Sequence, residues 1–430
     1  MIISSVSVPL VGLVGTGVLG HLDDEVYLAA VAAAAQVFSL LFVGLNFLRM
    51  GTTGITAQAH GSMTRGASGT TAVRQSLGEA VIVAVVLGLL IILLQVPIAT
   101  AAFGLIGAAP DVTHLGREYF AIRVWSAPAA LFNFAALGWL LGMQNARGPL
   151  AITLVINLTN VALDLWLVLG LGLKVAGVAT GAMLAEVAGA VAAAWLLRRE
   201  LMRHPGNWSG TRLLDPQAYR ALLRINGNLF IRTLALMFTF AFVTVQGARS
   251  GSVVLAANAL LMNFQWLTSY ALDGIANAAE ALVGRAVGAQ DAAGFRNAVR
   301  RTLAWSLAFG GLFSLTFWLG GAAIVRLLTS LPEIRTTALE YLPWLIVLPL
   351  ISVWSFFYDG VFVGATLSRE MRVVMTTSAA LVFIPVWYFT RDLGNHGLWL
   401  AFTTFMVARG LFMHLWFNRL KESLAHAATT

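Results

Sequence analysis

Residues 76–103 read SLGEAVIVAVVLGLLIILLQVPIATAAF, a run in which apolar side chains follow one another almost without interruption. A block of about 20 apolar residues is long enough to cross the hydrocarbon core of a bilayer, about 30 Å thick, as an α-helix. The strands of a membrane barrel would instead alternate apolar and polar residues over about ten positions. No such alternation runs along this sequence, so the stretch predicts a transmembrane helix.

Blocks of this kind recur along all 430 residues, of which 59% are hydrophobic and only 11% are charged. An ordinary soluble domain has about a quarter of its residues charged. We therefore predict an all-α polytopic membrane protein with twelve transmembrane helices. The expected spans are residues 1–20, 29–59, 76–103, 117–143, 149–171, 176–198, 219–247, 253–284, 298–328, 337–365, 371–391 and 396–418.

The net charge of +8 comes from arginines scattered through the short loops between these blocks. A nucleic-acid-binding domain would instead gather them in a patch on a soluble face. With both termini in the cytoplasm, fifteen basic residues fall in inside loops or termini and six in outside loops, which fits the preference of Lys and Arg for the cytoplasmic side. We expect cytoplasmic termini, the lipid bilayer as the protein's surroundings, and no nucleic acid partner.

The longest polar stretch, residues 198–217, falls at the middle of the chain and has six predicted spans on each side. Two motifs recur in the two halves: residues 58–61 as 285–288, and Gly142 with Arg147 as Gly364 with Arg369. Because six spans return a chain to its starting side, we predict two six-helix lobes related by a pseudo-two-fold axis along the membrane normal. The expected parts are an N-terminal lobe at 1–200, a cytoplasmic linker at 201–218, a C-terminal lobe at 219–420 and a cytoplasmic tail at 421–430.

Enzymatic and metal chemistry find no support in the sequence. It contains no cysteine, and its seven histidines include no HExxH pair, so disulfides, thiol catalysis and a metal centre are not expected. Residues 15–20 read GTGVLG, but a dinucleotide fingerprint of this pattern must lie between a strand and a helix. Here it lies in a predicted span, where small residues let helices pack closely. We interpret residues 23–25, Asp-Asp-Glu, as a solvated turn, and we predict no catalytic residue, metal or cofactor.

Ionisable side chains inside the predicted spans are the candidates for function, because each costs about 2.5–3.5 kcal/mol at the centre of a membrane helix. Asp164 stands out, since Asn157 and Asn160 precede it by seven and four residues and lie on the same helical face. The oxygens of these three side chains can hold a sodium ion or form a proton-linked network. The alternative is that they satisfy one another at a helix contact.

A second group of ionisable residues is harder to assign. Arg49, Asp273 and Glu280 lie in the second and eighth spans, where a pair among them would be either structural or a gate. Asp359 is a candidate for facing a central cavity, and we expect Arg232 and Arg409, near span ends, to extend toward the membrane surface. Arg123 and Glu186 complete the set.

Several segments of the chain, taken in order, resemble the multidrug and toxic compound extrusion (MATE) transporters, and most closely their DNA-damage-inducible protein F (DinF) branch. These segments are residues 12–22, 48–54, 58–61, 144–147, 163–164 and 359–366. The similarity covers nearly the whole chain. It implies two lobes around a central cleft and export of cationic or amphipathic small molecules by antiport against protons or sodium. It further implies a monomer in a bacterial inner membrane.

The resemblance also implies roles for individual residues. Asn160 and Asp164 match positions used for cation coupling in the N-terminal lobe, and Thr180 is a further match. Asp359 matches an acidic position in the C-terminal lobe of some sodium-coupled relatives, but their acidic residue in the seventh span has no counterpart where Arg232 stands.

One departure from the family concerns the first span. The family usually carries an aspartate where this sequence has Gly15, in Val14-Gly15-Thr16. Without that carboxylate Asp164 lacks its expected partner. Either coupling runs through other acidic residues, or this member is altered.

The resemblance places the substrate in an apolar cleft lined by the first, second, seventh and eighth spans. Aromatic and Met side chains there offer adaptable surfaces to flat cations, although each could equally be a packing or lipid-facing residue. The candidates are Phe47, Met50, Met262, Phe264, Trp266 and Tyr270. An alternative function is a lipid-linked oligosaccharide flippase of the same wider superfamily, which would hold a diphosphate with arginines such as Arg49, Arg123 and Arg232.

Overall fold

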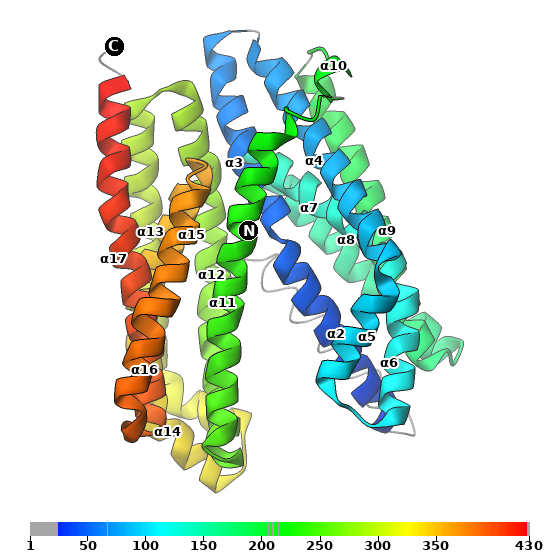
Figure 1. The fold of residues 1–430 in the computed structure, drawn as a ribbon, viewed down its shortest axis with the longest axis vertical. Helices are drawn as coiled ribbons and strands as arrows, with labels where there is room; N and C mark the ends of the chain where they lie inside the picture. The colour runs from blue at the N-terminus through cyan, green and yellow to red at the C-terminus, as the bar shows by residue number, and fades with distance from the viewer. Residues whose placement is uncertain (1–24, 67, 205, 209, 214, 428–430) are drawn as a thin grey trace. The chain divides into compact units, whose positions relative to one another are not determined.

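The computed structural model describes residues 25–66, 68–204, 206–208, 210–213 and 215–427 (Figure 1). All regular elements within these ranges are helical, and ten of the helices are long and apolar enough to cross a membrane. The prediction of an all-α, multi-pass membrane protein is therefore confirmed. The predicted span at 1–20, with Gly15, lies outside the described residues. The chain divides into two compact units between Leu223 and Arg224, within helix α11.

The N-terminal unit contains the predicted second to sixth spans, several of which are interrupted. Its helices are α2 (Glu25–Leu45), α3 (Phe47–Ser62), α4 (Ser68–Leu93), α5 (Gln95–Ile106), α6 (Pro110–Arg123), α7 (Ala127–Gly142), α8 (Arg147–Asp164), α9 (Lys174–Arg203) and the short α10 (Gly210–Leu213). A 3-10 turn at Val124–Ser126 joins α6 to α7, and a π-helical turn at Leu165–Gly170 continues α8.

The C-terminal unit contains the longer helices. They are α11 (Tyr219–Arg249), α12 (Ser252–Ala289), α13 (Ala292–Leu328), α14 (Pro332–Gly364), α15 (Ser368–Thr377), α16 (Ile384–Thr390) and α17 (Asn395–Ala427), with a π-helical turn at Ser378–Phe383 between α15 and α16. Helix α12 forms where the span 253–284 is predicted, but it is not among the ten helices that are both long and apolar enough to cross a membrane. Its amides and acids, among them Asn258, Gln265 and Glu280, lower its hydropathy.

Each unit has its own apolar core. In the N-terminal unit Trp139 is fully buried and donates a hydrogen bond from Nε1 to the carbonyl of Val73, at 2.9 Å. In the C-terminal unit Phe317, Trp399 and Phe402 are buried together. Many large apolar side chains elsewhere are exposed, as expected for surfaces that face lipid rather than water.

The repeated glycine motif has the same structural role in both units. A Cβ atom at Gly142 of α7 would lie 2.6 Å from Thr56 Cβ of α3, and one at Gly364 of α14 would lie 2.6 Å from the carbonyl oxygen of Glu280 in α12. Small residues therefore let one helix of each pair approach the other closely. The turns that follow also match, since Gln144 and Thr366 both have positive φ, at 59° and 58°.

Candidate functional site

Asp164 lies at the end of α8, directly before the π-helical turn Leu165–Gly170. Its side chain is buried, with only 2% of the residue exposed, and Oδ1 accepts a hydrogen bond from Asn160 Nδ2 at 3.4 Å. The predicted proximity of Asn160 and Asp164 on one helical face is thus seen directly, while their role in cation coupling stays a prediction. Asn157, one turn earlier, is half-buried, and so is Thr180 on the neighbouring helix α9.

Small residues on α9 bring its backbone close to Asp164. Gly177, Gly181, Ala185 and Gly189 recur every four residues and are all buried, which places them on one side of the helix. A Cβ atom at Gly181 would lie 2.5 Å from Asp164 Oδ1. Gly181 therefore leaves the space that the carboxylate occupies between α8 and α9.

A second carboxylate, that of Glu186, lies on the same helix α9. Asn133 of α7 donates hydrogen bonds from Nδ2 to Glu186 Oε2 at 2.8 Å and to the Glu186 carbonyl oxygen at 3.0 Å. From the sequence we singled out Glu186 only as an ionisable residue within a span, and we did not predict a role for Asn133. A lone amide inside the apolar stretch Ala127–Gly142 is the signal that could have identified it.

Arg123, at the end of α6, is the basic group of this region. It donates a hydrogen bond from Nη1 to the Tyr119 hydroxyl at 2.7 Å, and its guanidinium carbon lies 4.7 Å from the centre of the Phe38 ring. Its positive charge acts on both Asp164 and Glu186. The N-terminal unit thus holds two carboxylates within the electrostatic reach of one guanidinium.

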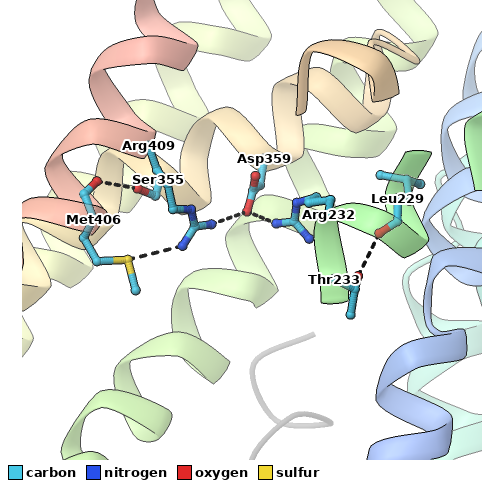
Figure 2. A network of polar contacts seen from close by, with 7 residues as sticks. All are labelled: Leu229, Arg232, Thr233, Ser355, Asp359, Met406 and Arg409. Atoms are coloured by element: carbon cyan, nitrogen blue, oxygen red, sulfur yellow. Dashed lines mark hydrogen bonds and ion pairs between the residues drawn. The ribbon is translucent and has the colours of Figure 1, made fainter. Parts of the chain in front are cut away.

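The C-terminal unit holds a different polar cluster, centred on Asp359 of α14 (Figure 2). Its Oδ2 accepts hydrogen bonds from Nη2 of Arg232 in α11 and from Nη2 of Arg409 in α17, the latter at 3.0 Å. Figure 2 shows the two guanidinium groups reaching the carboxylate from opposite sides. Asp359 therefore joins three helices of this unit through two buried ion pairs.

The expectation that Arg232 and Arg409 extend toward the membrane surface is wrong. Only 7% of Arg232 and 2% of Arg409 is exposed. Each guanidinium forms an ion pair with Asp359 inside the helix bundle. The charged groups therefore do not need to extend to the water at the membrane surface.

The other ionisable candidates lie on α3 and α12. Arg49 of α3 donates from Nε to Asn46 Oδ1 at 3.1 Å. On α12, Glu280 is buried, whereas Asp273 is exposed and acts electrostatically on Arg409. Whether Arg49, Asp273 or Glu280 takes part in gating stays a prediction.

The predicted substrate residues differ in their surroundings. Phe47 and Met50 are buried, and so is Phe264, which lies in the core with its ring centre 4.9 Å from that of Phe317. Phe264 therefore contributes to packing of this unit, and Met262 packs at the edge of the same core. Trp266 is 43% exposed, and its ring stacks on Phe240 and lies near Tyr270, with ring centres 4.9 and 6.4 Å apart.

Comparisons with known proteins place these observations in a family context. A family model described as MatE matches residues 1–166 and 229–389. The chain is 41% identical to "DNA damage-inducible protein F" of Escherichia coli (strain K12), across 100% of this chain and 92% of that protein. It is 25% identical to "Probable multidrug resistance protein NorM" of Rhizobium meliloti (strain 1021), across 93% and 87% of the two chains.

The fold is also shared with solved structures. A "Crystal structure of MATE in the bent conformation" superposes with a TM-score of 0.88, at 19% identity, across 100% of this chain and 95% of that one. At this low identity the similarity concerns the fold alone.

Proposed function

We propose that this chain, which belongs to the MatE family of membrane transporters, exports cationic or amphipathic compounds by antiport against protons or sodium. Its relative from Rhizobium meliloti is named a probable multidrug resistance protein, and this supports the proposed class of substrate. We place the protein in a bacterial inner membrane with both termini in the cytoplasm. Transport would proceed by alternating access, in which the coupling cation binds one conformation better than the other.

The observation that carries the proposal is the contrast between two buried carboxylates. Asp359 is held by two guanidinium groups. Asp164, within the part of the chain that the structure describes, accepts a hydrogen bond from an amide and forms no ion pair. A buried carboxylate that is not paired directly with a positive side chain is costly, and a bound proton or sodium ion lowers that cost. Asp164 with Asn160, rather than Asp359, is therefore the better candidate for cation coupling.

The backbone after Asp164 adds to this argument. The π-helical turn Leu165–Gly170 changes the hydrogen-bond register of the helix directly after the carboxylate. Single π-turns within α-helices occur frequently at functional sites. Cation binding at Asp164 would thus act directly beside the irregular turn that follows α8.

Replacing Asp164 by asparagine should reduce gradient-driven efflux of a fluorescent cation from proteoliposomes by about tenfold or more, because coupling cannot exceed the difference in cation affinity between the two conformations. Asp215→Asn is the matched control, since Asp215 is exposed and bonds the backbone N–H of Gln217. Equal efflux by Asp164→Asn and Asp215→Asn would remove Asp164 from the mechanism.

Gly181→Ala should weaken the cation site without unfolding the protein. The new methyl group would meet Asp164 Oδ1 at 2.5 Å, and such overpacking typically costs about 1–3 kcal/mol. We expect the half-saturating proton or sodium concentration for transport to rise by roughly fivefold or more. Gly104→Ala is the control, since a Cβ there meets no described atom within 4 Å. An equal rise in the half-saturating cation concentration for both variants would contradict a cation site at Asp164.

The arginines favour this function over a lipid-linked oligosaccharide flippase. Arg232 and Arg409 are bound to Asp359, and Arg123 packs against Phe38 and Tyr119. A diphosphate would have to displace a carboxylate to reach the first two. Transport assays with drug cations and with diphosphate lipids separate the two functions, and Arg49→Ala should be damaging only for a flippase. Trp266 and Tyr270, beside Phe240, remain the best candidates for contact with a flat cation.

A further inference from the structure

We propose that Glu186, held by Asn133, is a second proton-binding carboxylate of the N-terminal unit, and that Glu186 and Asp164 together bind one proton. This inference rests on the proposed antiport function and names a further group that performs it. It follows from the hydrogen bonding of Asn133, from the absence of an ion pair at either carboxylate among the described residues, and from the charge of the cluster.

The amide of Asn133 is incompletely satisfied although it is buried, with 2% of the residue exposed. Its Nδ2 donates to Glu186 Oε2 and to the Glu186 carbonyl oxygen. Its carbonyl oxygen Oδ1 has no hydrogen-bond partner among the residues that the structure describes. A buried acceptor without a donor costs about 1–3 kcal/mol, so a donor placed beside Asn133 Oδ1 would stabilise this arrangement.

A proton on Glu186 would supply that donor. A neutral carboxyl group carries one O–H donor and one acceptor oxygen, and a primary amide carries the complementary pair. After a small rotation the Glu186 O–H can donate to Asn133 Oδ1 while Oε2 keeps the bond from Nδ2. The two side chains then satisfy each other in a cyclic pair, and no charge remains on Glu186.

The charges around Glu186 indicate how many protons are bound. Helices α2, α6, α7 and α8 pack against α9, and among their side chains Arg123 acts on Glu186 and on Asp164 alike. The Tyr119 hydroxyl of α6 is buried and accepts a hydrogen bond from Arg123. The remaining charged or titratable side chains that the structure describes on α6 and α8, and the acid of α2, are exposed: Glu25, Asp111, His114, Arg117, Glu118 and Arg147. With both carboxylates ionised the cluster of Asp164, Glu186 and Arg123 carries one net negative charge, and one proton makes it neutral.

The test measures proton release by the purified full-length protein in weakly buffered detergent when a cationic drug is added. We expect about one proton per wild-type molecule, and an apparent drug affinity that changes by about tenfold per pH unit, because proton and drug binding are linked. Glu186→Gln should release almost no proton and bind the drug with an affinity that varies less than twofold with pH. A purely structural role would change the affinity equally at every pH.

Glu200→Gln is the matched control on the same helix. Glu200 is buried and bonds Asn145 and Arg203 near the end of α9, so its amide variant should release protons as the wild type does. The inference would be overturned if Glu186→Gln released protons as the wild type does. It would also be overturned if the wild type bound radioactive sodium and Glu186→Gln did not. If the wild type itself fails to transport against a gradient, the proposed function fails instead.

Discussion

Asp359→Asn should lower the free energy of unfolding of the C-terminal unit by about 3–5 kcal/mol, because removing one member of a buried ion pair leaves the other charge uncompensated. Here one carboxylate serves both Arg232 and Arg409. The substitution keeps the size of the side chain and removes only the charge. Since α11, α14 and α17 meet at this point, we expect the loss of stability to affect the whole C-terminal unit rather than one helix end.

Thermal or denaturant unfolding in detergent measures this effect, and Asp392→Asn is the control. Asp392 has 93% of its side chain exposed and lies 3.9 Å from Arg391, so we expect a change within about 0.5 kcal/mol. A third variant, with Asp359, Arg232 and Arg409 all replaced by Met or Leu, should recover most of the lost stability, since buried ion pairs can often be replaced by apolar groups. Equal stability of Asp359→Asn and Asp392→Asn would show that the ion pairs contribute little.

The sequence predicted the parts of this protein that depend on neighbouring residues. A membrane span needs only a continuous apolar block, and the contact between Asn160 and Asp164 needs only a separation of four residues on one helix. These features can be predicted from the local sequence, because they do not depend on how the rest of the chain folds.

Contacts between distant residues could not be predicted in the same way. Arg232 and Arg409 lie 127 and 50 positions from Asp359, and Asn133 lies 53 positions from Glu186. Only the packing of helices brings these groups together. Without that information a basic residue near a span end suggests an extended side chain, which is why the expectation for Arg232 and Arg409 was wrong.

The absence of an aspartate at position 15 left two interpretations open, namely coupling through other acidic residues or an altered transporter. The geometry around Glu186 favours the first. Glu186 lies on α9, as does Gly181, whose backbone approaches Asp164. A second carboxylate is therefore available to the N-terminal unit from α9, the helix on which the resemblance marks only Thr180.

Gly142→Val and Gly364→Val should each destabilise the protein by about 3 kcal/mol, near the upper end of what overpacking costs. The nearest atoms to a Cβ at these positions include backbone atoms, which cannot move aside as a side-chain tip can. At Gly142 they include Ala57 N and Thr53 O, each at 2.9 Å, and at Gly364 they include Glu280 O at 2.6 Å and Gly284 N at 2.9 Å.

The two substitutions also test whether the repeated motif has one role in both units. Because the glycines lie in separate units and share no partner, the double variant should lose about 6 kcal/mol, the sum of the single effects, and little folded protein should survive detergent extraction. Gly311→Val on α13 is the control, since a Cβ there meets no described atom within 4 Å. A strong effect at one glycine and a weak effect at the other would mean that the motif is retained in the second unit for a reason other than close helix packing.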